Sequence, residues 1–151
     1  MPKVRITKEF TFEAAHALEG YDGPCKNIHG HSYALSVTVI GDPSLNQDTP
    51  KKGMVMDFGD LKRMIKTSII DPFDHALILQ SGAQKESLGM IHGEICDNVI
   101  IVGYQPTSEN MLIDFAGKIA KLLPSTLKLH SLRLRETGTS YAEWFAEDQV
   151  V

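Results

Sequence analysis

Residues 31–40 read HSYALSVTVI, and this stretch decides the fold because apolar and β-branched residues alternate along it. Alternation with a period of two is typical of a β-strand with one buried face. The preceding segment, Lys3–Leu18, alternates in the same way and places His16 on the face of its apolar residues. The turn-rich sequence Gly20–Pro24 separates the two segments, so we expect the strands to pair antiparallel.

The middle of the chain has the spacing of α-helices. Asp57 is a plausible N-cap for a helix whose apolar residues recur at helical intervals, and Asp71-Pro72 predicts its end. A second helix is expected to open at Pro106–Glu109, where a Thr or Ser cap precedes an acidic residue, and to end at Pro124.

Further strands are expected at 98–103, 127–135 and 140–145, whereas 80–97 has no clear pattern beyond a loop with a short helix. Strand pairs on either side of a helical middle predict a single α+β domain over 1–151, with two helices on one face of an antiparallel sheet. Because such a sheet has open edges, a homo-oligomer is expected.

The composition excludes several classes of protein. A formal net charge of −4 argues against a general nucleic-acid binder, and there is no apolar run long enough to span a membrane. The first residues lack the apolar core of a signal peptide. The chain has two cysteines, which we interpret as thiols of a cytoplasmic protein rather than as a disulfide.

The sequence Cys25–His31 (CKNIHGH) carries the strongest chemical signal. His29 and His31 are two apart, so an extended backbone presents both imidazoles on one side. Antiparallel pairing brings His16 to the same place. Three neutral imidazoles suit zinc and leave a fourth position for water or substrate, so we predict a zinc site rather than three unrelated surface histidines.

Cys25 has two interpretations, which the sequence leaves open. In the first, the thiol lies beside the metal and Lys26 and transfers protons. In the second, it is a fourth ligand that closes the site as a structural one. Asp74 next to His75 fits an acid–base pair, but a loop histidine at a helix end is the simpler interpretation.

Two carboxylates have weaker signals. Glu136 ends a predicted strand and Glu109 lies in the first turn of a predicted helix, positions that solvated carboxylates also occupy. A buried carboxylate also accepts two parallel N–H bonds from an amidine-like edge of a ligand.

Six motifs together resemble the 6-pyruvoyltetrahydropterin synthase / 6-carboxytetrahydropterin synthase family, in the family order and over nearly the whole chain. They are FTFEAAH (Phe10–His16), CxxxHGH (Cys25–His31), GMVMDF (Gly53–Phe58), Asp74-His75, PTSEN (Pro106–Asn110) and Glu136-Thr137. The resemblance implies the tunnelling fold, with a four-stranded antiparallel sheet and two helices on one face. It also implies trimeric barrels stacked as a hexamer, with sites between subunits.

The resemblance also implies roles for individual residues. These are zinc binding for His16, His29 and His31; proton transfer for Cys25, Asp74 and His75; anchoring of the pterin's amino-pyrimidine edge for Glu136; and closure over the pterin for Thr107, Ser108 and Glu109.

The implied reaction is the zinc-dependent conversion of 7,8-dihydroneopterin triphosphate to 6-carboxy-5,6,7,8-tetrahydropterin in queuosine biosynthesis, with release of acetaldehyde and triphosphate. The alternatives are 6-pyruvoyltetrahydropterin synthesis, aldolase-like cleavage of dihydroneopterin, and a non-catalytic zinc-stabilised binding module. The compact CxxxHGH loop resembles the carboxy branch, although 80–103 is longer than expected for it.

Overall fold

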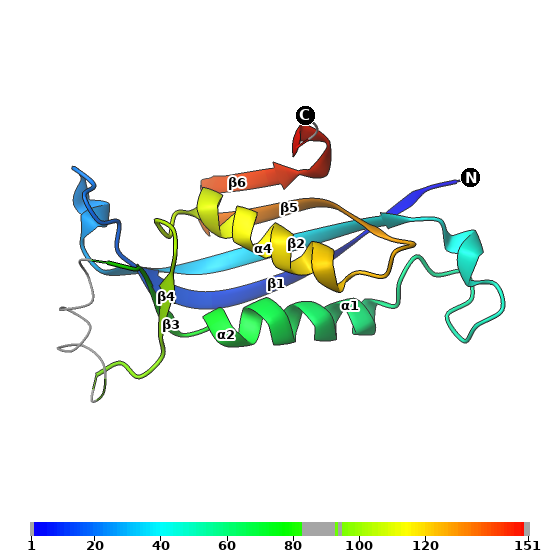
Figure 1. Ribbon diagram of the computed structural model, residues 1–151, viewed down its shortest axis with the longest axis horizontal. Coiled ribbons are helices and arrows are strands. Elements are labelled where there is room, and N and C mark those ends of the chain that lie inside the picture. The colour runs from blue at the N-terminus through cyan, green and yellow to red at the C-terminus, as the bar shows by residue number, and fades with distance from the viewer. Residues whose placement is uncertain (1, 83–92, 94, 150–151) are drawn as a thin grey trace.

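The two long strands expected from the alternating segments form the centre of the sheet. The computed structural model describes residues 2–82, 93 and 95–149. Strand β1 (Val4–His16) and strand β2 (His29–Gly41) pair antiparallel along their whole length, as Figure 1 shows. Strand β2 begins two residues earlier than the sequence predicts, which brings its first histidine into the ladder.

The two C-terminal strands extend this antiparallel sheet. Strand β5 (Lys128–Thr137) pairs with β2, and β6 (Ser140–Phe145) pairs with β5. Both strands confirm the predictions at 127–135 and 140–145. The antiparallel part of the sheet therefore has the order β1, β2, β5, β6.

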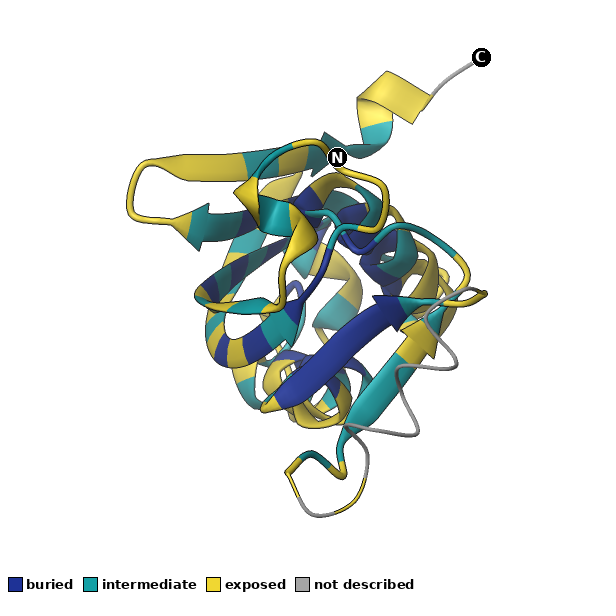
Figure 2. Cartoon of the chain, turned by 90° about the vertical axis from the view of Figure 1, so that its left-hand side faces the viewer, coloured by how far each residue is buried: buried dark blue, intermediate teal, exposed yellow. Residues whose placement is uncertain are grey.

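The prediction of a four-stranded sheet is wrong, because two short strands extend the sheet beyond β1. Strand β3 (Ala76–Gln80) runs parallel to β1, and β4 (Val99–Val102) runs parallel to β3. Strand β4 was expected and β3 was not. Four of the five residues of β3 are buried, and a strand covered on both faces has no alternating pattern. Figure 2 draws this strand mostly in the dark blue of buried residues. The expected loop and short helix within 80–97 lie mostly outside the described residues.

The first helical segment begins and ends where the sequence predicts. Helix α1 (Phe58–Ile65) begins after Asp57, whose Oδ1 accepts from two backbone N–H groups, and continues through a π-helical turn η3 (Lys66–Ile70) into α2 (Asp71–Phe73). The segment ends at the residue after Pro72, which confirms the end predicted at Asp71-Pro72. Because proline has no N–H and crowds the preceding turn, the wider π turn before it accommodates the ring.

The second helix, α4 (Ser108–Leu122), confirms the prediction and begins at Thr107, whose hydroxyl accepts from a backbone N–H. Both long helical segments lie on the same face of the sheet (Figure 1). The main core lies between them and the sheet, and its largest buried side chains include Tyr33, Phe12, Phe73, Phe115, Leu35, Leu61, Ile65 and Met111. No helix in the described part of the chain has the length and apolar character needed to cross a membrane.

The two faces of the sheet differ in chemistry. Alternate residues of β1 and β2, such as Phe12 and Tyr33, enter the core, so His16, continuing the same alternation, lies on the helix-covered face. Residues such as Glu13 and Ser32 point to the other face. The alternation thus places potential metal ligands on one side of the sheet and a polar surface on the other.

Candidate metal and catalytic site

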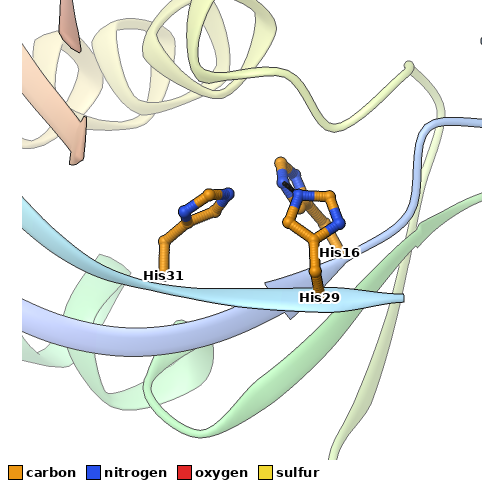
Figure 3. A group of neighbouring side chains, drawn as sticks. All are labelled: His16, His29 and His31. Carbon is orange, nitrogen blue, oxygen red and sulfur yellow. Dashed lines mark hydrogen bonds between the residues drawn. The ribbon is translucent and has the colours of Figure 1, made fainter. Parts of the chain in front are cut away.

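The three predicted metal ligands converge at one end of the β1–β2 pair. His16 lies directly opposite His29 in the register, and His31 is two residues further along β2. Figure 3 shows the three imidazoles on the same side of the two strands. One ligand atom from each residue lies within 4.8 Å of the other two. The strand geometry expected from the sequence is therefore confirmed for these three residues.

Main-chain carbonyls fix the tautomers of two of these rings. Nδ1–H of His16 donates to the Pro106 carbonyl at 2.6 Å, and Nδ1–H of His29 donates to the Asn27 carbonyl at 2.7 Å. A carbonyl only accepts, so in each neutral ring the lone pair is on Nε2. Sequence reasoning missed both carbonyls, because an acceptor of the main chain has no side-chain signature.

The two lone pairs face each other, which is the observation that best fits a metal ion. His16 Nε2 and His29 Nε2 are 3.0 Å apart. Burial is the main cause that lowers the pKa of His16, and burial also lowers the pKa of His31. Neutral imidazoles with converging acceptor atoms are the form that ligates zinc, so the donor set fits this ion.

Glu136 lies beside the same nitrogens. Its Oε1 is 3.6 Å from His16 Nε2 and 3.5 Å from His31 Nε2. It also lines a hollow of about 310 Å³, which extends to the N-terminus of α4 and is lined by Ser108, Glu109, Glu136, Ser140, Tyr141 and Ala142. The Ser108 hydroxyl is buried there without a hydrogen-bond partner. A polar ligand in the hollow would therefore contact both carboxylates.

Cys25 lies on the loop between β1 and β2, within the single 3-10 turn Pro24–Lys26. Its carbonyl accepts from the Leu18 N–H at 3.0 Å, and the residue is half-buried. The thiol is not a member of the metal-binding group, which among the described residues consists of the three histidines alone. This geometry favours the open site over one closed by a fourth protein ligand.

Asp74 and His75 directly precede β3, the strand that lies next to β1 on the side away from β2. The carboxylate Oδ1 of Asp74 accepts from the Glu13 N–H at 2.9 Å and lies 3.1 Å from His75 Nδ1. The Glu13 N–H, followed by His75, lowers the pKa of Asp74. The His75 side chain is 77% exposed and lines a hollow of about 380 Å³ together with side chains from the polar face. The same hollow is lined by Glu13 and Ser32, which point to the face opposite to the imidazoles, and also by His31.

Comparison with known proteins identifies the family. The chain matches the family model described as 6-pyruvoyl tetrahydropterin synthase over residues 5–147. The chain belongs to the 6-pyruvoyl tetrahydropterin synthase family. The family inferred from the six motifs is therefore confirmed, and it accounts for the order of strands and helices.

Relatives by sequence have names from the carboxy branch of this family. The 6-carboxy-5,6,7,8-tetrahydropterin synthase of Haemophilus influenzae is 38% identical over 141 residues, which cover 93% of this chain and 97% of that protein. The protein of the same name from Synechocystis sp. is 34% identical, with coverage of 93% and 92%.

Solved structures share the fold. The 6-pyruvoyl tetrahydropterin synthase of Caenorhabditis elegans superposes with a TM-score of 0.67 at 25% identity, covering 97% of each chain. An uncharacterized protein from Wolinella succinogenes gives a TM-score of 0.74 at 20% identity, covering 97% of this chain and 99% of that one. The α+β fold expected for this family is thereby confirmed.

Proposed function

We propose that this member of the 6-pyruvoyl tetrahydropterin synthase family converts 7,8-dihydroneopterin triphosphate to 6-carboxy-5,6,7,8-tetrahydropterin, with release of acetaldehyde and triphosphate. The names of its relatives support the carboxy product. The observation that carries the proposal is the convergence of three imidazoles, two of them held by carbonyls, beside a polar hollow. The pathway that we propose is queuosine biosynthesis in the cytoplasm.

We propose zinc as the metal, held by His16, His29 and His31. When bound, zinc supplies Lewis-acid polarisation of the substrate's side-chain hydroxyls. The protein holds the three rings in one orientation, because strand pairing fixes their backbones and carbonyls fix two of their tautomers. The hollow beside them provides room for the substrate.

Two carboxylates line the hollow beside the three imidazoles. Glu136 belongs to β5, and Glu109 lies in the first turn of α4. We propose that Glu136 accepts the N–H groups of the pterin's amino-pyrimidine edge. We propose that Glu109, together with Thr107 and Ser108, closes over the pterin.

Proton transfer is proposed for Cys25 and for the Asp74–His75 pair. Cys25 is on the loop that leads into the metal-binding end of β2, so its thiolate would take a proton from the substrate's side chain. Because the His75 side chain is 77% exposed and is not a member of the metal-binding group, we propose that it serves a neighbouring subunit in a trimer-based hexamer. Its ring would deliver and remove protons while Asp74 orients it.

Two alternatives differ in their products or in the role of the metal. A 6-pyruvoyl product follows if triphosphate is eliminated without side-chain cleavage, as the name of the Caenorhabditis elegans structure describes for that protein. A non-catalytic zinc-stabilised module requires a closed site, which the position of Cys25 does not favour.

Product analysis tests the proposal. Zinc-loaded protein is incubated with 7,8-dihydroneopterin triphosphate, and the pterin is identified by mass spectrometry while acetaldehyde is assayed. The expected result is a 6-carboxy product with one equivalent of acetaldehyde. A 6-pyruvoyl product without acetaldehyde would establish the alternative activity, and absence of turnover with zinc tightly bound would contradict both. Glu136→Gln should raise KM, because the amide would present an N–H group to the N–H groups of the amino-pyrimidine edge.

A further inference from the structure

The backbone at His75 adopts a conformation that side-chain-bearing residues rarely take. Among the residues that the structure describes, His75 is the only non-glycine residue with a positive φ, at 60°. It follows Asp74, the residue with an extended backbone that comes directly after α2 (Asp71–Phe73). Such a conformation persists only where the surrounding structure holds it in place.

One end of the peptide unit between Asp74 and His75 is held by β1. The His75 N–H donates to the Glu13 carbonyl at 2.5 Å. The Glu13 N–H donates in turn to the Asp74 carboxylate at 2.9 Å. Glu13 therefore holds the pair through its main chain, which substitution of its side chain leaves in place.

The other end of the same peptide unit is held by Asn98. The side-chain amide of Asn98 donates to the main-chain carbonyl of Asp74 at 3.3 Å. The main-chain carbonyl of Asn98 accepts from the Leu77 N–H at 2.9 Å. Asn98 is half-buried and immediately precedes β4 (Val99–Val102). Its two hydrogen bonds thus bracket His75 on both sides.

We propose that Asn98 is a positioning residue for the Asp74–His75 pair. With its carbonyl held by Asn98 and its N–H held by β1, the peptide plane between these residues is fixed, and so are ψ of Asp74 and φ of His75. The φ of His75 sets the direction of its Cα–Cβ bond, from which the imidazole extends, and a small misplacement of a proton-transfer group costs a large factor in rate. The inference rests on the proposed function, in which this pair transfers protons.

The proposal assigns a role to the segment before β4. That segment supplies Asn98 across the β3–β4 pair, so the two strands beyond the antiparallel sheet support the Asp74–His75 pair as well as extending the core. Asn98 itself does not need to touch the substrate. Asn98 affects the rate through the position of His75, whereas a residue that only stabilises the fold would not act through His75.

Steady-state kinetics of Asn98→Ala and of the isosteric Asn98→Asp test the proposal in the full-length, zinc-loaded protein. Asn46→Ala is the matched control, because Asn46 Nδ2 makes the same kind of bond to the Met54 carbonyl. It lies in the 3-10 turn Pro43–Asn46, at the opposite end of β2 from the histidines. We expect both Asn98 variants to lose on the order of 10- to 100-fold in kcat, with KM and zinc content unchanged. Asn46→Ala should retain wild-type kcat.

A double-mutant cycle separates positioning from stability. If Asn98 acts through His75, then Asn98→Ala should cause no further loss of kcat in a His75→Ala background. Equal losses in both backgrounds, or a lower Tm with unchanged kcat, would overturn the positioning role. Full turnover by His75→Ala alone would overturn the proton-transfer role on which the inference rests, so the two failures have different signatures.

Discussion

Removal of zinc from the loaded protein is expected to lower its thermal stability without unfolding it at room temperature. The main core consists of side chains from both helical segments and the strands, and it does not require the metal. Of the three ligands, only His16 is fully buried, whereas His29 and His31 lie at the half-exposed edge. Chelation should therefore remove the stabilisation that comes from metal binding to the three histidines and leave the fold intact.

The size of this effect follows from binding linkage. A ligand that binds only the folded state stabilises it by about 2.7 kcal/mol at a free concentration about 100 times its Kd. For a chain of 151 residues, 1 kcal/mol corresponds to roughly 2–4 °C in Tm. Chelation at that zinc concentration should therefore lower Tm by about 5–11 °C.

Differential scanning calorimetry with zinc and with a chelator measures the shift. His29→Ala should abolish the difference between the two conditions, while His130→Ala should retain it, because His130 lies on β5 and contacts Ser131 instead. Complete unfolding on chelation would contradict the reasoning, since a closed structural zinc site behaves in that way. An unchanged Tm would show that the three histidines do not hold the metal.

Three further predictions concern catalysis, packing and pH. Cys25→Ala should retain zinc, as measured by atomic absorption, but lose about 10²–10⁴-fold in kcat because the proton-transfer group is gone; loss of zinc would instead favour a fourth ligand. Phe115→Ala should lower the free energy of unfolding in urea by about 3–5 kcal/mol, because its ring is fully buried; a change below about 1 kcal/mol would contradict this packing. Asp74 has a lowered pKa in the folded state, so its stabilisation relative to Asp74→Asn should be present at neutral pH and disappear as pH falls through that pKa. Urea titrations at several pH values measure this difference, and a difference that grows towards acid pH would have the wrong sign.

Local patterns of apolar residues were sufficient to predict most of the strands and helices. Alternation identified β1 and β2, and the pairing of His16 with His29 follows from two strands joined by a single loop. Strand β3 was missed because Ala76–Gln80 is apolar without alternation, and both of its faces are covered. Asp71-Pro72 marked the end of the first helical segment correctly, but the residue types before it do not predict the π turn that precedes the proline.

The sequence predicted that the three histidines lie together, but it did not predict where Asp74 and His75 lie relative to them. The three histidines form a group because their spacing matches the strand period. The face on which Asp74 and His75 lie depends on hydrogen bonds with Glu13, which is 61 residues away from Asp74 in sequence. Non-local pairings of this kind, including that of Asn98, have no short-range signal.

The central claim, an open zinc site held by three histidines with Cys25 outside the ligand set, is tested most directly by zinc K-edge X-ray absorption of the metal-loaded protein. The account predicts three nitrogen scatterers from imidazole and an oxygen from water, at about 2.0–2.1 Å, without sulfur. A sulfur scatterer at about 2.3 Å would place the Cys25 thiol on the metal and contradict the account.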